Sequence, residues 1–498
     1  MENKVTVEIQ PSHETIFAKP GSSLQDILFD YGVEFPCGGA GTCGNCKIRL
    51  LRGNLEINDI QRNYFSEDEL ADGWRLACQC TVSEPVTLEL AQWEMDILSD
   101  NQRLKSKGTT GFAVAIDLGT TTLVAQLIDL NSGFIKATKT TLNPQARYGA
   151  DIMSRIEYAV NENGTLQLRD LIRSKLSGMI LELIGSEKNA DMQIEQIVIA
   201  GNTAMHHLFC GLDVTPLSMV PFKTDNANEY RWSAKDLGWN IPGNPTVRFL
   251  PCIGGFVGSD VLAGMLATEM HSEDGLVALV DLGTNGEVVV GNRGKFLCAS
   301  TAAGPAFEGA KISMGMRATT GAISKVTLAD GKMVAHVIGS GKAKGICGSG
   351  LVDAVACALE SGMIDSSGRI LTESGKIHIR DNVFLNQQDI RELQLAKAAI
   401  AAGVEILAKR FSVSLKDIEK VHIAGAFGNY INVENARKIG LLNTLFSNII
   451  QSGNTSLHGT KLIAVSDYDY QEVLSLTSHV ALGTDPEFMD RFVENMKF

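Results

Sequence analysis

Four cysteines in the first part of the chain have the spacing to hold an iron–sulfur cluster. Three form the pattern C-x5-C-x2-C in one short segment, and the fourth follows later in Leu-Ala-Cys-Gln; they are Cys37, Cys43, Cys46 and Cys78. A [2Fe–2S] centre takes four thiolates, and the glycines between the first three let the backbone curl closely around sulfide ions. The pattern predicts a [2Fe–2S] cluster and one-electron chemistry.

Zinc is the main alternative metal, because Cys43-x2-Cys46 alone fits a zinc knuckle. A zinc ribbon needs a second C-x2-C pair, whereas Cys78 and Cys80 are separated by a single residue. Disulfides are a weaker alternative. Cys80 lies close enough to Cys78 to be confused with the fourth ligand. The other five cysteines have apolar neighbours and are expected to be buried thiols: Cys210, Cys252, Cys298, Cys347 and Cys357.

Two copies of Asp-Leu-Gly-Thr, at Asp117–Thr120 and Asp281–Thr284, predict a second kind of chemistry. Each copy follows an apolar run, and each has downstream of it another apolar run that turns at Ile-Ala-Gly. A Gly-Thr turn offers N–H groups and hydroxyls to phosphate oxygens, and the aspartate can hold Mg²⁺ directly or through water. One copy alone would be an ordinary turn, but the repetition predicts two similar lobes around one nucleotide cleft.

These two chemistries need separate domains, and a chain of 498 residues is expected to hold about three. Short strands are predicted at 5–9, 15–18, 48–51 and 86–90, with a helix at 23–31. Residues 99–111 are polar and are typical of a flexible linker. We therefore expect a cluster domain over 1–92, a linker over 93–111, a first lobe over 112–275 and a second lobe over 276–498.

Composition and charge exclude several other classes of protein. The net charge of −13 argues against nucleic-acid binding, and no apolar run reaches the ~18–20 residues that span a membrane. Ten cysteines in a chain with no export signal predict a reducing cytoplasm. Residues 1–92 hold 14 acidic and 7 basic residues, either as a solvated surface or as a docking face for a redox partner.

The first 90 residues resemble the plant-type and vertebrate-type [2Fe–2S] ferredoxins, which implies a β-grasp-like α+β domain with Cys78 as the fourth ligand. From residue 112 onward the chain resembles the actin-like ATPase superfamily, which includes acetate and sugar kinases. That resemblance implies a duplicated α/β fold with two lobes around a cleft for Mg-ATP. Asp117–Thr122 and Asp281–Glu287 would be its phosphate loops, and Gly425–Asn429 its adenosine segment.

The same resemblance assigns roles to single residues. Asp117 and Asp281 would support Mg²⁺, and Asp260 would position the attacking water. Asp260 could instead cap the helix that follows it. The expected nucleotide contacts are Gly119, Thr120, Thr121, Thr122, Gly283, Thr284, Asn285, Gly425 and Gly428.

Together, the two halves resemble the ATP-dependent reductive activators of corrinoid proteins. Local stretches agree with that family, among them Gly149-Ala-Asp-Ile-Met-Ser-Arg155, Gly304-Pro-Ala-Phe-Glu-Gly309 and Gly345-Ile-Cys-Gly-Ser-Gly350. The resemblance implies an iron–sulfur ATPase that passes an electron to inactive Co(II) and restores Co(I) in a corrinoid protein or corrinoid methyltransferase. It also implies an upstream low-potential electron donor, and it leaves a homodimer open.

One departure from the family and two other functions remain. Larger relatives carry a middle domain between the linker and the ATPase half, whereas the first ATPase strand here begins at Phe112, so we expect that domain to be missing. A redox-sensing small-molecule kinase would phosphorylate its acceptor without a protein partner. A corrinoid-protein chaperone ATPase would tolerate loss of the cluster.

Overall fold

The computed structural model describes residues 4–10, 14–29, 31, 33, 35, 39–41, 46–90, 104–106, 108–149, 151–186, 192–220, 222, 226–304, 306–309, 311–319, 321–339, 341–466 and 468–498. Cys37, Cys43 and most of the predicted linker lie outside these residues. No helix in the described part of the chain is both long and apolar enough to cross a bilayer.

The N-terminal domain is a mixed five-stranded sheet of order β2-β1-β7-β4-β5 with short helices beside it. Its elements are β1 (Val5–Gln10), β2 (Glu14–Ala18), β3 (Ser22–Ser23), α1 (Leu24–Phe29), β4 (Lys47–Arg52), α2 (Asp59–Tyr64), α3 (Glu67–Ala71), β5 (Trp74–Leu76), η1 (Ala77–Gln79), β6 (Thr81–Val82) and β7 (Val86–Leu90). Alternate residues of β1 and β7 are buried, because successive side chains of a strand point to opposite faces. The parallel pairing of β1 with β7 and the antiparallel strands around it confirm the predicted β-grasp-like fold.

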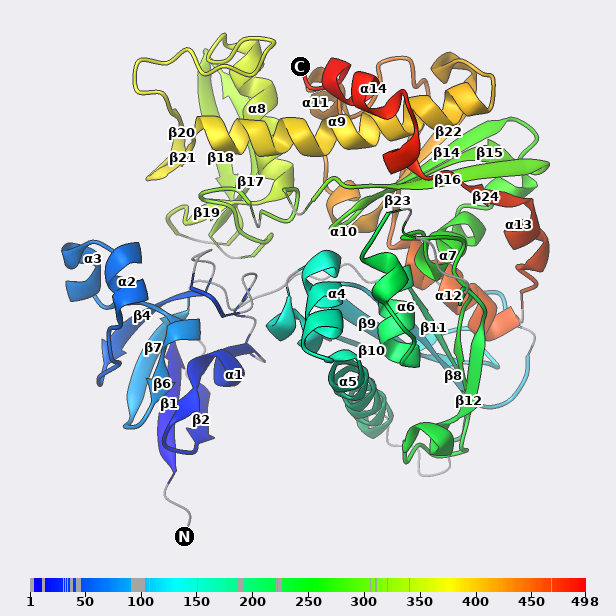
Figure 1. Cartoon of the computed structure of the whole chain (residues 1–498), viewed down its shortest axis with the longest axis horizontal. Helices are drawn as coiled ribbons and strands as arrows, with labels where there is room; N and C mark the ends of the chain where they lie inside the picture. The colour runs from blue at the N-terminus through cyan, green and yellow to red at the C-terminus, as the bar shows by residue number, and fades with distance from the viewer. Residues whose placement is uncertain are drawn as a thin grey trace.

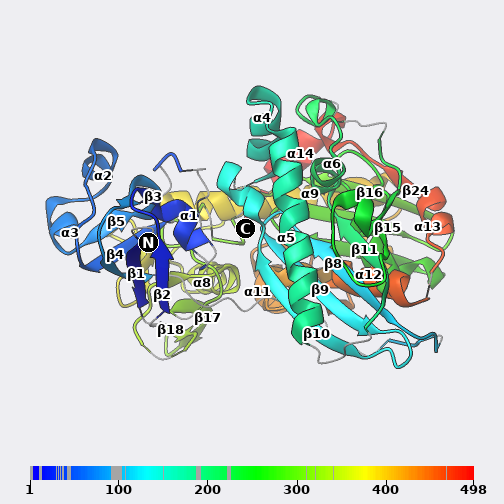
Figure 2. The same cartoon turned by 90° about the horizontal axis from the view of Figure 1, so that it is seen from below.

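Lobe I is a six-stranded sheet of order β10-β9-β8-β11-β13-β12. Its elements are β8 (Phe112–Leu118), β9 (Thr122–Asp129), β10 (Ile135–Leu142), η2 (Pro144–Tyr148), α4 (Ile152–Asn161), α5 (Thr165–Ser186), β11 (Ile194–Gly201), α6 (Thr203–Cys210), β12 (Tyr230–Ser233), β13 (Thr246–Phe249) and α7 (Ser259–Ala267). Helices α4, α5 and α6 cover one face of this sheet (Figure 2). The described end of the predicted linker also packs on this lobe, since Leu104 is buried there and its N–H donates to the Gly133 carbonyl at 3.0 Å.

Lobe II is a second six-stranded sheet, of order β23-β22-β14-β15-β16-β24, with a large insertion between β16 and β22. Its elements are β14 (Leu276–Leu282), β15 (Gly286–Asn292), β16 (Lys295–Thr301), β17 (Ala322–Ala329), β18 (Lys332–Val337), β19 (Gly345–Ile346), α8 (Gly348–Glu360), β20 (Ile377–Arg380), β21 (Val383–Leu385), α9 (Gln387–Arg410), β22 (Ile418–Ala424), α10 (Gly425–Gly428), α11 (Val433–Lys438), β23 (Ile449–Gly453), α12 (Thr455–Ser466), α13 (Gln471–Leu476), β24 (Thr477–His479) and α14 (Phe488–Glu494). Helix α9 runs across the top of the lobe in Figure 1.

The two lobes have the same central topology, as the repeated motifs predict. In each lobe the first strand, β8 or β14, has two successive antiparallel strands on one side, β9–β10 or β15–β16. A parallel strand, β11 or β22, lies on its other side. The register agrees as well: Asp117 pairs with Ala200 across β8 and β11, and Asp281 pairs with Ala424 across β14 and β22. The two Asp-Leu-Gly-Thr turns therefore occupy equivalent positions in two copies of one unit.

Helices α7 and α12 join the lobes and share one buried core with both sheets. Helix α12 belongs to lobe II by sequence, yet it packs on β8 and β11 of lobe I. The two helices approach closely at glycines: a Cβ built on Gly459 would lie 1.9 Å from the Ala263 carbonyl oxygen, and one built on Gly264 would lie 3.1 Å from Thr455 Oγ1. The absence of these side chains sets the distance between the lobes.

The N-terminal domain contacts lobe I through η2, which follows β10 directly. Arg147 Nη1 lies 3.5 Å from an Asp26 carboxylate oxygen, and the Arg147 guanidinium carbon lies 4.7 Å from the ring centroid of Phe29. Leu142 and Ala146 pack against the apolar core of the N-terminal domain. An exposed ion pair and a cation–π contact are each worth about 1 kcal/mol, so this contact is weak enough to form and break.

The close approach of α7 and α12 leads to a stability prediction. Replacing Gly459 with alanine should lower the free energy of unfolding of the ATPase half by about 2–3 kcal/mol, because the new methyl group must push backbone atoms apart. Thermal unfolding followed by circular dichroism measures the change. The matched control is Gly178→Ala in α5, where a Cβ meets no atom within 4 Å and should stabilise the helix by up to about 1 kcal/mol. Equal behaviour of the two variants would contradict the role given to Gly459.

Candidate functional site

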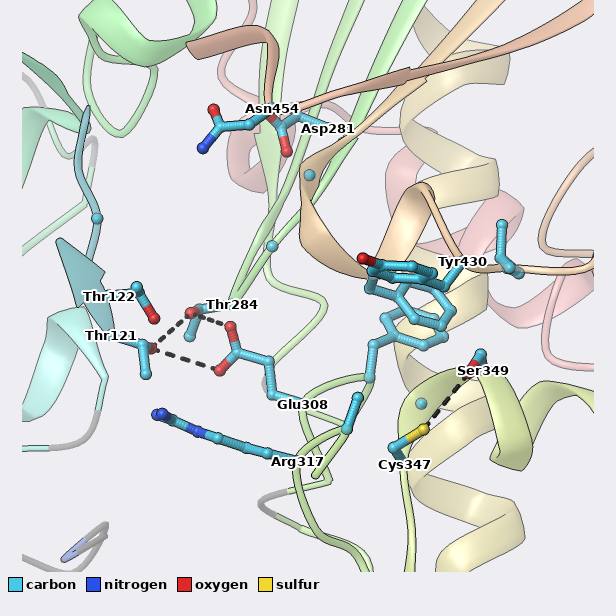
Figure 3. A pocket seen from close by; sticks show the side chains of 18 of the residues that line it. Thr121, Thr122, Asp281, Thr284, Glu308, Arg317, Cys347, Ser349, Tyr430 and Asn454 are labelled. Atoms are coloured by element: carbon cyan, nitrogen blue, oxygen red, sulfur yellow. Dashed lines mark hydrogen bonds between the residues drawn. The ribbon is translucent and has the colours of Figure 1, made fainter. Parts of the chain in front are cut away.

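A cavity of about 890 Å³ lies between the two lobes, and both Asp-Leu-Gly-Thr turns line it. Figure 3 shows Thr121 and Thr122 of lobe I opposite Thr284 and Glu308 of lobe II. The cavity continues toward α8, α10 and the strand pair β17–β18. Its volume is that of a pocket for a ligand of nucleotide size.

Phosphate loop one is the turn between β8 and β9. The Gly119 N–H donates to the Thr122 carbonyl at 3.0 Å, and a Cβ on Gly119 would lie 2.5 Å from that carbonyl oxygen. Asn202, at the Ile-Ala-Gly-Asn turn, donates from Nδ2 to Thr120 Oγ1 at 2.8 Å. Thr121 and Thr122 both line the cavity, so this loop brings hydroxyl groups and a tight glycine turn to a ligand there, as phosphate binding requires.

Phosphate loop two is the equivalent turn between β14 and β15, and it meets loop one through a shared carboxylate. The Gly283 N–H donates to the Asn285 carbonyl at 3.0 Å. Glu308 accepts a 2.8 Å hydrogen bond from Thr284 Oγ1 and a 3.5 Å one from Thr121 Oγ1. The two threonine hydroxyls lie 3.3 Å apart (Figure 3). One carboxyl group thus connects the phosphate loops of both lobes.

Three aspartates meet at the floor of the cleft, where Asp117, Asp281 and Asp260 all line the cavity. Removal from water raises the pKa of Asp281 to about 7, and the nearby charge of Asp117 adds to the shift. Removal from water also raises the pKa of Asp260 to about 7, with the charge of Asp281 as the next cause. Glu287 is paired with Asp281 across β14 and β15, and its burial raises its pKa as well. The buried floor therefore gathers several carboxyl groups that water does not solvate, and each of them makes ionisation of the others less favourable.

Each of the two loop aspartates lies beside the first turn of a helix from the other lobe. Asp117 accepts hydrogen bonds from Asn454 Nδ2 at 2.9 Å and from Ser456 Oγ at 2.8 Å, at the start of α12. Asp281 lies near Asp260 in the first turn of α7. The prediction that Asp260 caps this helix is wrong, because the N-cap is Gly258. Asp260 Oδ1 instead accepts a 2.9 Å bond from the Val261 N–H.

The carboxylates fit Mg²⁺ that arrives with a nucleotide. Among the described residues, no three His, Cys, Asp or Glu side chains form a group able to hold a metal ion. Magnesium commonly takes one or two carboxylates together with phosphate oxygens and water. Asp117 and Asp281 reach the same cavity from opposite lobes, so a cation bound to a triphosphate there would contact both sides of the cleft and relieve their repulsion.

The predicted adenosine segment is only partly confirmed as part of the cavity. Gly425 lines it with φ +86°, and a Cβ there would lie 2.7 Å from Asp281 Oδ1, so only glycine leaves this space open. Gly428 is not among the lining residues. Its Cβ position is occupied by Ile423 Cγ2, at 2.6 Å. Gly428 is therefore needed for packing of α10 on β22. The sequence motif alone does not distinguish a glycine needed for packing from one that contacts a ligand.

An aromatic group forms the far end of the cavity. Phe307 and Phe427 are stacked, with ring centroids 4.6 Å apart and an interplanar angle of 16°. Tyr430 is 57% exposed beside them at the mouth (Figure 3). The first residue of α8, Gly348, lets this group form, since a Cβ there would lie 2.0 Å from the Phe307 carbonyl oxygen. An aromatic end suits the adenine ring, and a floor of hydroxyl groups and carboxylates suits a triphosphate that carries Mg²⁺, so the cavity matches the two ends of Mg-ATP.

Two of the predicted cluster ligands lie together in the N-terminal domain. Cys46 Sγ and Cys78 Sγ are 3.4 Å apart, well beyond the ~2.05 Å of a disulfide. Gln79 Nε2 donates to Cys78 Sγ at 3.5 Å and to the Gly39 carbonyl at 2.6 Å, which brings the segment before Cys43 to the same place. Gly39 and Gly41 have φ values of +97° and +74°, as expected for a loop that wraps a cluster.

Cys80 differs from these two thiols. It is buried, and its environment raises the pKa of its thiol to about 12, with desolvation as the main cause. Its sulfur lies 3.8 Å from Gln61 Oε1. A thiol held protonated inside a core is a poor metal ligand, so Cys78 is the better fourth ligand. The ligand set Cys37, Cys43, Cys46 and Cys78 stays a prediction, because two members lie outside the described residues.

Comparison with known proteins decides between the classes left open by the sequence. Models described as "2Fe-2S iron-sulfur cluster binding domain", "RACo middle region" and "C-terminal domain of RACo the ASKHA domain" match residues 7–83, 112–273 and 275–498. The corrinoid activation enzyme RamQ of Eubacterium limosum is 35% identical over 437 residues, which cover 81% of this chain and 72% of RamQ. The chain belongs to the family of reductive activators of corrinoid proteins.

Two further members of this family agree along most of the chain. The [Co(II) methylated amine-specific corrinoid protein] reductase of Methanosarcina barkeri is 25% identical over 424 residues, covering 78% of this chain and 77% of that protein. The solved structure of a reductive activator for corrinoid,iron-sulfur protein superposes with a TM-score of 0.69 at 27% identity, covering 99% of this chain and 98% of that one. The predicted fold class, the [2Fe–2S] cluster and the use of Mg-ATP are thereby confirmed.

One expectation is overturned by the same comparison. The sequence suggested that the middle domain of larger relatives is missing, but the model of the middle region matches residues 112–273. Those residues fold as lobe I, with the sheet built on β8 and β11. The middle region of the family is here the first half of the duplicated ATPase unit. This region is therefore present in the chain, as lobe I.

Several site residues were not predicted. Glu308 lies in the quoted stretch Gly304-Pro-Ala-Phe-Glu-Gly309 but was given no role, and Arg317 was overlooked altogether. Arg317 lines the cavity near Glu308 in Figure 3, and burial lowers its pKa to about 10. Asn202, Asn454 and Ser456 sit at helix starts. Their signal was the cap-type residue just before an apolar helix, which indicates a helix boundary rather than a ligand site.

The crowded carboxylates predict a pH-dependent stability. Because the folded pKa of Asp260 is near 7 and the unfolded value is about 3.9, the folded state binds more protons between these values and loses stability as pH rises through them. Asp260→Asn should therefore raise the melting temperature of the nucleotide-free protein at pH 8 by roughly 3–6 °C. The difference from the unmodified protein should become clearly smaller at pH 5 and approach zero only near about pH 4, where the unfolded carboxyl is protonated as well.

Differential scanning fluorimetry across this pH range measures the effect. The control is Asp274→Asn, whose side chain is 75% exposed and should leave the melting curve unchanged at both pH values. A stabilisation of Asp260→Asn that is the same at pH 5 and pH 8 would show that charge repulsion is not its cause.

The thiol geometry predicts which cysteine variants lose the cluster. Cys46→Ala and Cys78→Ala should abolish the visible absorption and the iron content of anaerobically purified protein, since the neighbouring Cys80 thiol is buried in the core, where desolvation favours its protonated form. Cys80→Ser should retain both, because its side chain contacts Gln61 inside the core. Iron analysis and the reduced-state EPR signal measure the outcome. Retention of a normal cluster in Cys78→Ala would reassign the fourth ligand.

Proposed function

We propose that this protein restores Co(I) in a corrinoid protein or corrinoid methyltransferase by passing an electron from its [2Fe–2S] cluster in an ATP-dependent reaction. The observation that carries this proposal is the union of a cluster domain and a two-lobed nucleotide cleft in one chain, together with 35% identity to a corrinoid activation enzyme. Cys37, Cys43, Cys46 and Cys78 are the proposed cluster ligands.

The need for ATP follows from redox potentials. Ferredoxin clusters of the plant type have potentials near about −400 mV, and Co(II) corrinoids require a stronger reductant than this. Each 59 mV of shortfall in a one-electron step lowers the equilibrium constant about tenfold. Free energy from another source must therefore change the cobalt environment or separate the products. When bound, the cluster supplies a one-electron carrier and Mg-ATP supplies that free energy.

The residues of the cleft are suited to convert nucleotide binding into motion of the lobes. Thr121 and Thr284 lie on opposite lobes only 3.3 Å apart, so a phosphate group bound by both hydroxyls would hold the two loops in a fixed relative position. Asp117 and Asp281 approach the same space from the two sides. Glu308 links the two threonines. Closure of such a cleft on a ligand is a common way to order a complex before the slow step.

We also propose three features of the setting. The cluster must be reloaded after each turnover, so an upstream low-potential electron donor is needed, and the acidic N-terminal domain suits a donor with a basic face. None of the described cysteines forms a disulfide, which favours a reducing cytoplasm. The surfaces that select the particular corrinoid partner belong to both proteins. The third proposed feature is a homodimer, which the resemblance to this family leaves open.

The function is tested by the dependence of Co(I) formation on nucleotide. Chemically reduced protein mixed anaerobically with a Co(II) corrinoid protein should produce the Co(I) absorption band only after Mg-ATP is added. Asp281→Ala should lower this rate on the order of 100-fold, the usual cost of losing one charge-stabilising group, while the cluster spectrum stays unchanged. The control is Asp274→Ala just before the same strand, an exposed residue paired with Arg293, which should behave like the unmodified protein.

Two outcomes would contradict the proposal. Complete Co(I) formation without nucleotide would make the ATP site unnecessary for reduction and would favour a redox-sensing kinase. Activation of the corrinoid protein by a cluster-free variant would favour a chaperone ATPase instead.

A further inference from the structure

The segment that follows β10 is bonded directly to phosphate loop one. Asn143 is fully buried and caps η2. Its backbone N–H donates to the Thr121 carbonyl at 2.8 Å, and its side-chain Nδ2 donates to the Gly119 carbonyl at 2.9 Å. We call residues Asn143–Tyr148 the docking segment. Its first residue therefore contacts the backbone of the loop that is placed to hold phosphate.

The other end of the docking segment contacts the N-terminal domain. Arg147 pairs with Asp26 at 3.5 Å and stacks over Phe29 at 4.7 Å, and both of these residues belong to α1. Ala146 and the preceding Leu142 pack against the same domain. Arg147 lies only four positions after Asn143, so a contact to phosphate loop one and a contact to the domain that carries the cysteines are close together in the chain.

Helix α1 in turn borders the cluster loop. It contacts η1, which contains Cys78. A Cβ on Gly39 would lie 2.6 Å from the side-chain oxygen of Gln25 in the first turn of α1, so Gly39 lies directly against this helix. Among the described residues, contacts therefore lead from phosphate loop one through the docking segment and α1 to η1, which holds Cys78.

We propose that the docking segment holds the N-terminal domain against lobe I in a nucleotide-dependent way and that Arg147 is a positioning residue for electron delivery. This inference rests on the proposed function for its role, but the docking itself can be tested without a corrinoid partner.

The direction of the effect follows from the hydrogen bonds. A phosphate bound at loop one fixes the peptide groups of Gly119 and Thr121. The carbonyl groups of these two residues accept hydrogen bonds from Asn143. Ordering of this loop orders the docking segment, and Arg147 then meets Asp26 and Phe29 more often. Among the described residues, the contact includes an ion pair, a ring contact and a small apolar patch, the kind of interface that lets domains separate and return. Nucleotide should therefore favour the docked position of the N-terminal domain, and loss of nucleotide should release it.

Hydrogen–deuterium exchange on the full-length holoprotein tests the docking. With a non-hydrolysable Mg-ATP analogue, amide protons of α1 should exchange severalfold more slowly than without nucleotide. In Arg147→Ala this dependence on nucleotide should disappear, while exchange in the β8 and β11 strands of lobe I stays as in the unmodified protein. The matched control is Arg169→Ala, which breaks the Arg169–Asp170 pair on α5. The side chains of that pair are 28% and 66% exposed, against 23% and 66% for Arg147 and Asp26. It should keep the dependence.

A second measurement separates positioning from folding. Arg147→Asp should lower the ATP-dependent rate of Co(I) formation about tenfold, with cluster content, reduced-state EPR signal and ATP hydrolysis in the absence of partner unchanged. The double variant Arg147→Asp with Asp26→Arg restores the ion pair in reverse and should recover part of the rate, as expected for two groups that act through each other.

The outcomes distinguish this inference from the proposed function. If exchange of α1 is the same with and without nucleotide, or if Arg147→Ala retains the dependence, the docking proposal is overturned whatever the enzyme does with cobalt. If the exchange result holds but the unmodified protein makes no Co(I) with Mg-ATP, the proposed function fails and the docking stands. Equal losses in both single charge variants with no recovery in the double variant would overturn the pairing of Arg147 with Asp26.

Discussion

The ATPase half depends on the negative charge at the floor of its cleft. Asp117, Asp260 and Asp281 line one cavity, and removal from water raises the pKa values of the last two to about 7. A triphosphate would add more negative charge to the same space. The cleft can accept it only with a divalent cation and a full set of donors. The glycine turns, the threonine hydroxyls and the buried guanidinium of Arg317 supply those donors from both lobes.

The two halves of the duplicated unit have diverged at equivalent positions around this charge. Asp117 is opposed by Asn454 and Ser456, which donate hydrogen bonds to it. Asp281 is opposed by Asp260, which repels it. Asn454 and Ser456 lie at the start of α12, which follows β23, and Asp260 lies in the first turn of α7, which follows β13. One aspartate is therefore held in a fixed geometry by neutral donors, and the other is left to be neutralised by a proton or a cation. A symmetric fold has produced an asymmetric site.

The sequence predicted what repeats and what has a characteristic spacing. The β-grasp strands, the two phosphate loops and the close placement of Cys46 and Cys78 agree with expectation because each depends on local pattern. Glu308, Arg317, Asn454 and Ser456 could not be found in this way, since they reach the cleft from segments that only tertiary packing brings there. The contact of Gly428 with a nucleotide stays a prediction, because a glycine that admits Ile423 and a glycine that admits a ligand look the same in sequence. The middle region was missed because its strand pattern is that of lobe I.

Helix α12 also constrains how the chain reaches this fold. It is encoded near the C-terminus, yet it covers β8 and β11 of lobe I and shares their buried core. Synthesis proceeds from the N-terminus at roughly 5–20 residues per second, and N-terminal domains usually fold first. Lobe I cannot complete its core in that order, because the part of β8 and β11 that α12 covers beside α7 stays open until α12 has left the ribosome. The growing chain thus exposes part of the apolar face of lobe I from the time β13 is made until α12 is made. The core that the two lobes share can form only after both have been synthesised.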